Sequence, residues 1–169
     1  MTQMSNPLLR VDNLTMMYGD RVGCKDVSFE LRPGEVLGIV GESGSGKSTL
    51  LRSISAQQEP TKGTVKYNTR IDGVCDVYQM SEAQRRLLMR TDWAFVHQNP
   101  RDGLRMNVSA GANIGERLMA IGDRHYGNIR SNADAWLGKV EIASERLDDL
   151  PSTFSGGMQQ RLQIARNLV

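Results

Sequence analysis

The chain has 169 residues, of which 39% are hydrophobic and 24% are charged, and its formal net charge is +2. This length suits one domain, and the composition is that of an ordinary globular protein with a hydrophobic core. Basic residues alternate with acidic ones, so the charge gives no reason to expect nucleic acid as a partner. No stretch approaches the roughly 20 apolar residues that span a bilayer.

The two cysteines, Cys24 and Cys75, follow no metal-binding or redox spacing. Free thiols without a secretory signal are typical of the reducing cytosol. We therefore expect a cytoplasmic protein.

The first third of the chain predicts strands followed by a helix. Apolar residues alternate over residues 8–18 and again over 27–31, the pattern of half-buried strands. A turn is predicted at Pro33-Gly34, and the continuous apolar run at 36–40 predicts a strand buried on both faces. A glycine-rich segment comes next, and a helix is expected from about residue 47 to 56.

The remaining two thirds predict short strands and then helices. A strand is expected at 64–67, while the polar, turn-rich residues 68–77 are interpreted as a surface loop or an irregular strand. Ser81 and Gln84 have the spacing of a capping box for a helix that runs to about residue 89. Residues 93–97 predict another strand, residues 108–149 have helical apolar spacing, and a last amphipathic helix follows Gly157. This order predicts an α/β core with a helical lobe.

Residues 41–48, GESGSGKS, match the phosphate-loop motif G-x-x-x-x-G-K-[ST] at every fixed position. Its glycines let backbone N–H groups approach phosphate oxygens, and the following helix N-terminus favours an anion. Lys47 supplies a positive charge between the β- and γ-phosphates, and the Ser48 hydroxyl is a ligand for Mg²⁺. The alternative is a glycine-rich turn that binds nothing, which the flanking strand and helix disfavour. The expected ATP-binding residues of this segment are Gly41, Glu42, Ser43, Gly44, Ser45, Gly46, Lys47, Ser48 and Thr49.

A second glycine motif, Ser155-Gly156-Gly157, precedes the last predicted helix. Taken alone, it predicts an ordinary helix cap, because serine is a good N-cap and the glycines expose N–H groups. Together with the flanking residues FSGGMQQR it resembles the ABC signature usually written LSGGQ, with Phe and Met replacing Leu and Gln. The chain is thereby identified as a member of the ABC ATPase family.

The resemblance implies a fold and a pairing mode. The implied fold is a P-loop NTPase of ABC type, with a mainly parallel core sheet, an N-terminal antiparallel strand pair and a helical lobe. The implied partner is a second ABC subunit, whose bound ATP would be contacted by the signature residues. These residues are Ser155, Gly156, Gly157, Met158 and Gln159.

Two further residues take roles from the same resemblance. Gln98 resembles the Q-loop glutamine, which is catalytic and reaches Mg²⁺ or the attacking water; a polar strand end is the alternative. Tyr18 matches the aromatic residue that stacks on adenine, whereas a half-buried tyrosine at a strand end is the alternative. The implied cofactors are ATP and Mg²⁺, with the metal held by Ser48 and Gln98.

The sequence around these motifs narrows the resemblance. Residues 97–105 lack the serine-rich segment common in oligopeptide importers, and the chain resembles the ATP-binding proteins of the phosphonate carbon–phosphorus lyase system. This implies an ABC pair that docks on the lyase complex and supports phosphonate catabolism. Two alternatives stay open. One is an ATP-binding subunit of an oligopeptide or dipeptide importer, held by a permease at the inner membrane. The other is a nucleotide-binding module that does not hydrolyse ATP.

The sequence up to Val169 holds no counterpart of the Walker B aspartate, the catalytic glutamate or the switch histidine of this family. We therefore expect little ATP turnover by these 169 residues alone, because hydrolysis needs a held metal and an oriented water. A marginally stable chain is also expected, since the strand at 36–40 would have an unpaired edge. The expected organisation is one partial ABC domain over 1–169, with an ATP-binding core at 1–97, a Q-loop and helical lobe at 98–154, and the signature at 155–169.

Overall fold

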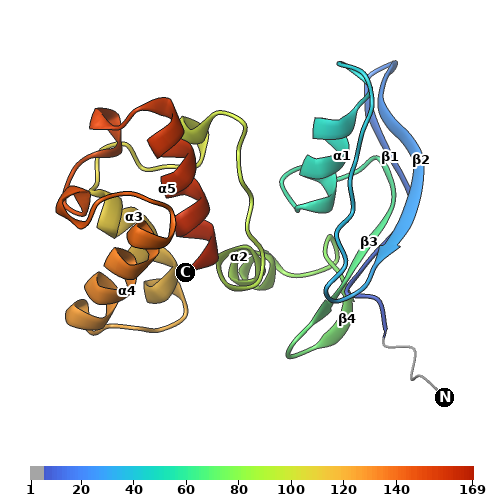
Figure 1. Cartoon of the computed structure of the whole chain (residues 1–169). Coiled ribbons are helices and arrows are strands. Elements are labelled where there is room, and N and C mark those ends of the chain that lie inside the picture. The colour runs from blue at the N-terminus through green and yellow to red at the C-terminus, as the bar shows by residue number, and fades with distance from the viewer. Residues whose placement is uncertain (1–5) are drawn as a thin grey trace. The chain divides into compact units, whose positions relative to one another are not determined.

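The computed structural model describes residues 6–169 and divides the chain into two compact units, Met1–Leu87 and Leu88–Val169 (Figure 1). The sheet and helix α1 (Lys47–Ile54) belong to the first unit, and helices α3 (Ala110–Ala120), α4 (Tyr126–Lys139) and α5 (Gly156–Leu168) belong to the second. Helix α2 (Glu82–Thr91) contains the boundary. None of the helices in the described chain is long and apolar enough to cross a membrane.

The first unit is built on an antiparallel sheet with the strand order β2-β1-β3-β4. Its strands are β1 (Leu9–Tyr18), β2 (Arg21–Leu31), β3 (Lys62–Thr69) and β4 (Gly73–Asp76). Val11 and Leu14 of β1 and Val65 of β3 are buried, as the alternation of apolar residues requires for a half-buried sheet. The predicted antiparallel strand pair at the N-terminus is confirmed, and the turn-rich segment at 68–77 contains the short strand β4.

The prediction of a mainly parallel sheet is wrong for residues 6–169, in which every strand pairing is antiparallel. Residues 36–40 and 93–97, expected as strands, have no regular secondary structure. Val36 and Val40 are 97% and 92% exposed. A strand needs neighbours that accept and donate its backbone hydrogen bonds, and no described segment lies in register with residues 36–40. The apolar composition of residues 36–40 therefore predicted a strand that the structure does not have.

Helices α1 and α2 begin where the sequence predicts. Helix α1 starts at Lys47, directly after the glycine-rich loop, and buries Leu50. Ser81 and Gln84 form the expected capping box. The Gln84 N–H donates to Ser81 Oγ at 3.3 Å, and Gln84 Oε1 accepts from the Ser81 N–H at 3.0 Å.

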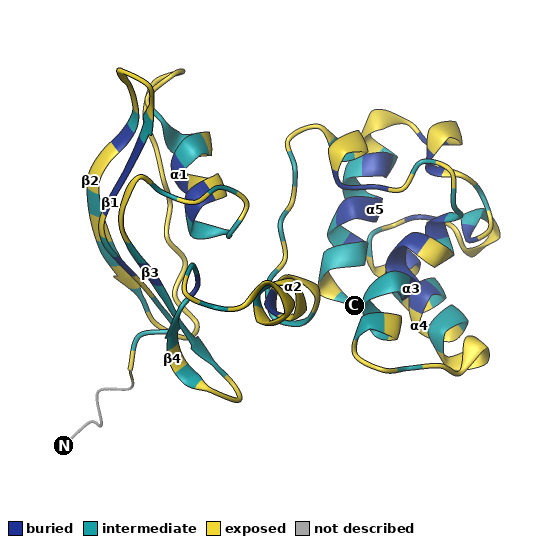
Figure 2. Ribbon diagram, turned by 180° about the vertical axis from the view of Figure 1, so that it is seen from behind, coloured by how far each residue is buried: buried dark blue, intermediate teal, exposed yellow. Residues whose placement is uncertain are grey.

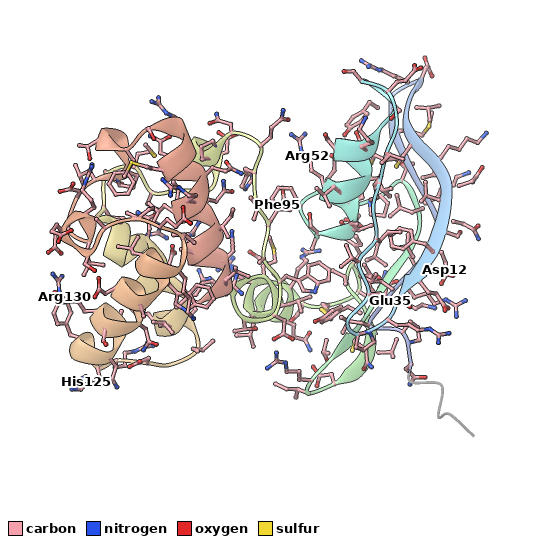
Figure 3. The ribbon with its side chains drawn as sticks, viewed as in Figure 1. Asp12, Glu35, Arg52, Phe95, His125 and Arg130 are labelled. Carbon is pink, nitrogen blue, oxygen red and sulfur yellow. The ribbon has the colours of Figure 1, made fainter. Side chains whose placement is uncertain are left out.

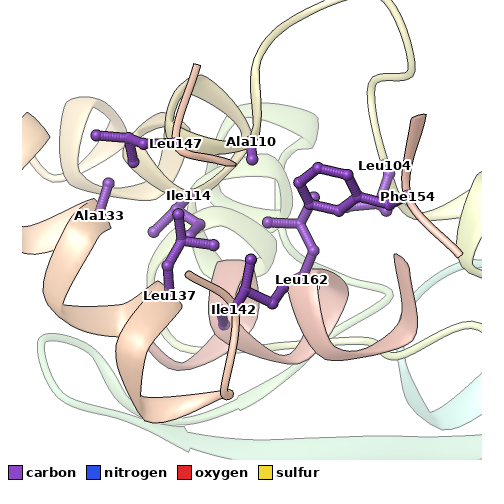
Figure 4. Close-up of a cluster of buried hydrophobic side chains, with 10 residues drawn as sticks. Leu104, Ala110, Ile114, Ala133, Leu137, Ile142, Leu147, Phe154 and Leu162 are labelled. Carbon is purple, nitrogen blue, oxygen red and sulfur yellow. The ribbon is translucent and has the colours of Figure 1, made fainter. Parts of the chain in front are cut away.

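The second unit has its own hydrophobic core, built from buried residues of α3, α4 and α5 (Figure 2) and from the segments between them. These segments contain the short helices η1 (Pro100–Asp102), η2 (Ser144–Arg146) and η3 (Pro151–Thr153). Fully buried side chains include Ile114 of α3, Leu137 of α4 and Leu162 of α5. Figure 4 shows these packed with the other members of the core. The core consists of Leu104, Ala110, Ile114, Ala133, Leu137, Ile142, Leu147, Phe154, Leu162 and Ala165. The helical lobe expected over 108–149 is thus present, with helix breaks at 121–125 and after 139.

Candidate nucleotide-binding site

The glycine-rich loop closes tightly against strand β2 at Gly46. This residue is the N-cap of α1 and has a φ of 92°, in the left-handed region that favours glycine. A Cβ at Gly46 would lie 2.0 Å from Gly23 O and 3.5 Å from Cys24 Cβ, both on β2. The position therefore requires glycine for its backbone conformation and for its close approach to the sheet.

Gly44, at the tip of the same loop, uses glycine differently. Its φ is 83°, but nothing lies within 4 Å of the place where a Cβ would be. The Ser45 N–H donates to Glu42 O at 3.2 Å and closes the turn on which Gly44 lies. The loop thus has one glycine fixed against the sheet and another on its open side, where a ligand can approach the backbone.

The ammonium group of Lys47 lies across this loop. Its Nζ donates to Gly41 O at 2.8 Å and to Glu42 O at 2.6 Å, and a longer contact of 3.4 Å reaches Ser45 Oγ. A lysine ammonium has three donors, so these contacts use all of them. A phosphate group bound here would take over at least one of these donors.

The start of α1 offers several backbone donors to an anion. Within residues 6–169, the N–H groups of Gly44, Gly46, Lys47 and Ser48 have no protein acceptor, and no side chain caps the helix. Such N–H groups together with the helix dipole form an anion site. The Ser48 hydroxyl is exposed on the first turn. Groups of three or more acidic, His or Cys side chains that could hold a metal are absent from the described residues. A metal ion here would rely on Ser48, phosphate oxygens and water.

Tyr18 lies beside the first turn of α1, although the two are far apart in sequence. A Cβ at Gly23 would lie 2.8 Å from Tyr18 Cε2 and 2.9 Å from Thr49 Cγ2, so the lack of a side chain at this glycine lets the tyrosine ring lie close to the helix. Tyr18 is 44% exposed, and its hydroxyl donates to Gln58 Oε1 at 2.8 Å. The structure thus brings Tyr18 together with the expected phosphate-binding residues.

Sequence reasoning missed Gly23, Cys24 and Gln58 at this site. Burial raises the pKa of the Cys24 thiol, whose Cβ lies close to Gly46 of the loop. None of the three residues belongs to a motif. Gly23 belongs to β2 but lies outside the strand predicted at residues 27–31, so the link between a glycine in a strand and close backbone approach did not point to it.

The remaining predicted residues lie in the second unit. Gln98 is exposed and follows His97, before the short helix η1. Ser155 is the N-cap of α5, and its Oγ accepts from the Met158 N–H at 3.3 Å. Gly156 and Gly157 are exposed, with nothing within 4 Å of a hypothetical Cβ.

Met158 and Gln159 face the interior of the second unit. Met158 packs against its hydrophobic core. Gln159 is buried, and its Nε2 donates to Pro151 O at 2.8 Å and to Phe154 O at 3.2 Å. The Gln159 side chain therefore fixes the segment that leads into the signature, while Ser155, Gly156 and Gly157 form its open surface.

The comparisons with known proteins agree with these motifs. The sequence model of the ABC transporter family matches residues 24–169. The chain is 64% identical to PhnK of Escherichia coli (strain K12), a protein named for phosphonates utilization and ATP binding. That match covers 98% of this chain and 64% of PhnK. The chain is also 37% identical to a di/tripeptide transport ATP-binding protein, DppF of Pseudomonas aeruginosa (strain UCBPP-PA14), over 85% of this chain and 42% of that protein. It thus spans less than two thirds of the length of these relatives.

Solved structures show the same fold. The dimeric structure of the ATP-binding cassette MJ0796 bound to ADP and Pi matches with a TM-score of 0.83 and 30% identity, covering 95% of this chain and 68% of that one. An ATP-binding subunit of an ABC transporter matches with a TM-score of 0.75 and 25% identity, covering 95% of this chain and 61% of that one. The ABC ATPase fold class predicted from the phosphate loop and the signature is confirmed. The chain belongs to the ABC transporter family.

Proposed function

We propose that this chain binds Mg-ATP as the nucleotide-binding part of an ABC ATPase that serves phosphonate utilization. The observation that carries the proposal is the donor array at the start of α1, where free N–H groups and the Lys47 ammonium meet on the open side of a glycine-rich loop. Such an array matches the charge and the acceptor oxygens of a triphosphate.

Different residues of the first unit bind the phosphates, the metal and the base of the nucleotide. The backbone N–H groups of Gly44, Gly46, Lys47 and Ser48 donate to phosphate oxygens, and Lys47 exchanges a loop carbonyl for a phosphate oxygen. The Ser48 hydroxyl holds Mg²⁺, which neutralises phosphate charge when it is bound. Tyr18, beside the first turn of α1, stacks on the adenine.

The second unit supplies contacts for a partner and for hydrolysis. Ser155, Gly156 and Gly157 present an exposed helix N-terminus, which suits the γ-phosphate of ATP held by a second ABC subunit. Support for pairing comes from MJ0796, whose cassette is described as dimeric. In this proposal Gln98 is the glutamine that would orient the attacking water during hydrolysis.

The physiological role is proposed from the 64% identity to PhnK. We place the protein in the cytoplasm, as an ABC pair that docks on the carbon–phosphorus lyase complex. A peptide importer is a second candidate, because DppF, named for di/tripeptide transport, is 37% identical. Co-purification of the tagged protein with soluble lyase subunits supports the first role, and co-purification with a membrane permease supports the second.

Nucleotide binding is tested by calorimetric titration of Mg-ATP into the wild-type chain and into Lys47→Ala. We expect loss of measurable affinity in Lys47→Ala, because the triphosphate loses the one positive side chain of residues 41–48. The matched control is Lys25→Ala, which removes an exposed lysine of β2 in the same unit. Unchanged affinity in Lys47→Ala, or no binding by the wild-type chain, would refute the proposal.

A further inference from the structure

The segment between α1 and β3 contacts the candidate site through Gln58. We infer that Gln58 is a positioning residue for the base of the nucleotide: it holds the Tyr18 ring in one orientation beside the first turn of α1. This inference rests on the proposed binding of ATP at the phosphate loop. If the inference holds, Gln58 affects the affinity for ligands that carry an aromatic base. It does not affect the affinity for ligands that consist of phosphate alone.

The Tyr18 ring is held at two places. Its hydroxyl donates to Gln58 Oε1 at 2.8 Å, and its Cε2 edge lies over Gly23, where a Cβ would come within 2.8 Å of it. Tyr18 remains 44% exposed after these contacts and so has surface left for a planar ligand. Thr49 Cγ2 lies 2.9 Å from the same hypothetical Cβ, so the held ring is next to the turn that carries Lys47 and Ser48.

Gln58 is itself anchored through its backbone. Its N–H donates at 3.2 Å to the carbonyl of Arg52, a residue of the last turn of α1 that is labelled in Figure 3. Its carbonyl accepts from the Tyr78 hydroxyl at 2.6 Å, and the same hydroxyl contacts Ser53 O at 2.6 Å. The side chain that accepts the hydrogen bond from Tyr18 therefore extends from a backbone that is itself held by hydrogen bonds.

The end of β1 is tied to the same segment. The Met17 N–H donates to Thr61 Oγ1 at 3.0 Å, and the Thr61 N–H donates to Thr15 O at 2.9 Å. The backbone at Met17 and the side chain of Tyr18 are thus both restrained before any ligand binds. A side chain ordered in advance loses less conformational entropy on binding, which raises the affinity for the group that stacks on it.

The experiment compares two ligands, ATP and inorganic tripolyphosphate, in calorimetric titrations with Mg²⁺. Gln58→Leu removes the acceptor, Tyr18→Phe removes the donor but keeps the ring, and Gln58→Glu keeps an acceptor. We expect Gln58→Leu and Tyr18→Phe each to weaken ATP binding about two- to tenfold, the range of one hydrogen bond. Tripolyphosphate affinity should stay unchanged in both. Gln58→Glu and the control Gln57→Leu, which changes the exposed neighbouring side chain, should retain the affinity for ATP.

Two outcomes overturn the inference alone. In one, the wild type binds both ligands but Gln58→Leu and Tyr18→Phe bind ATP as tightly as it does. In the other, ATP and tripolyphosphate affinities fall together, which would mean that Gln58 only supports the loop. A wild-type chain that binds neither ligand refutes the proposed function, and the inference falls with it. Thermal melting of each variant shows whether its first unit is folded.

Discussion

The side-chain amide of Gln163 pairs with the backbone of His97: its Oε1 accepts from the His97 N–H at 2.5 Å, and its Nε2 donates to His97 O at 3.2 Å. Gln163 is fully buried on α5, and His97 directly precedes Gln98. Gly103 makes room for this amide, since a Cβ there would lie 2.5 Å from Gln163 Oε1. Arg166, one turn later on α5, donates to Gly103 O. The helix that begins at the signature therefore holds both ends of the loop that carries Gln98.

Replacing Gln163 by leucine should destabilise the second unit by about 1–3 kcal/mol, because the N–H and carbonyl of His97 lose their partners while the side-chain volume is nearly kept. Urea unfolding measures this loss, and hydrogen exchange at the His97 amide should become faster. The control is Gln160→Leu on the same helix, where the described structure shows no hydrogen bond of the side chain. Equal stability of the two variants would show that the amide pairing contributes nothing.

Gly44 and Gly46 of the phosphate loop should respond differently to alanine. Both have positive φ values, 83° at Gly44 and 92° at Gly46, so each substitution costs about 1–2 kcal/mol in backbone strain. Only Gly46→Ala adds a clash, with the carbonyl of Gly23 at 2.0 Å from the new Cβ. We expect Gly46→Ala to lower the melting temperature clearly more than Gly44→Ala and to abolish Mg-ATP binding. Similar melting temperatures would contradict the close approach of Gly46 to β2.

The sequence predicted the parts of the site that are local. Residues 41–48 lie together in the chain, and the conformation of a phosphate loop depends on glycines at fixed spacing, which a motif records. The capping box at Ser81 and Gln84 is local in the same sense, since its two hydrogen bonds join residues three apart. For these elements the residues that interact are also the residues that carry the pattern.

The errors concern features that depend on distant neighbours. Residues 36–40 are as apolar as a buried strand, but a strand forms only where another segment completes its hydrogen bonds, and apolar runs do not report that. Gln58 and Gly23 were missed because they meet Tyr18 from other segments, Gln58 from 40 positions away. Neither residue type signals a role in binding without the fold that brings them together.

Tyr78 should make stability sensitive to alkaline pH. Burial raises the pKa of its hydroxyl from 10.0 to about 12. A pKa raised in the folded state favours the protonated form there, so the stabilisation is complete below pH 10 and is lost as pH rises through about 12. Urea unfolding across this interval should show a decline that Tyr78→Phe reduces. Tyr126→Phe, at a tyrosine that is 72% exposed, is the control and should keep the wild-type decline. An identical pH dependence in Tyr78→Phe would refute the prediction.

Ser155 caps a helix and is also proposed to contact a phosphate. Two substitutions distinguish these roles. Its Oγ caps α5 by accepting from the Met158 N–H, and we propose that the same residue contacts the γ-phosphate of a partner's ATP. Aspartate caps a helix as well as serine does, whereas alanine costs about 1 kcal/mol. Ser155→Ala should therefore lower stability, while Ser155→Asp keeps it but places a negative charge against the phosphate.

The readout is the ATP-dependent formation of dimers, measured by sedimentation with and without Mg-ATP. Ser155→Asp should bind ATP with wild-type affinity yet remain monomeric, because like charges repel where the signature would meet the triphosphate. The matched control is Ser152→Asp, which adds the same charge at an exposed position three residues earlier. If Ser155→Asp dimerises with ATP as the wild type does, Ser155 is only a helix cap, and the surface that meets a second ABC subunit must be sought elsewhere.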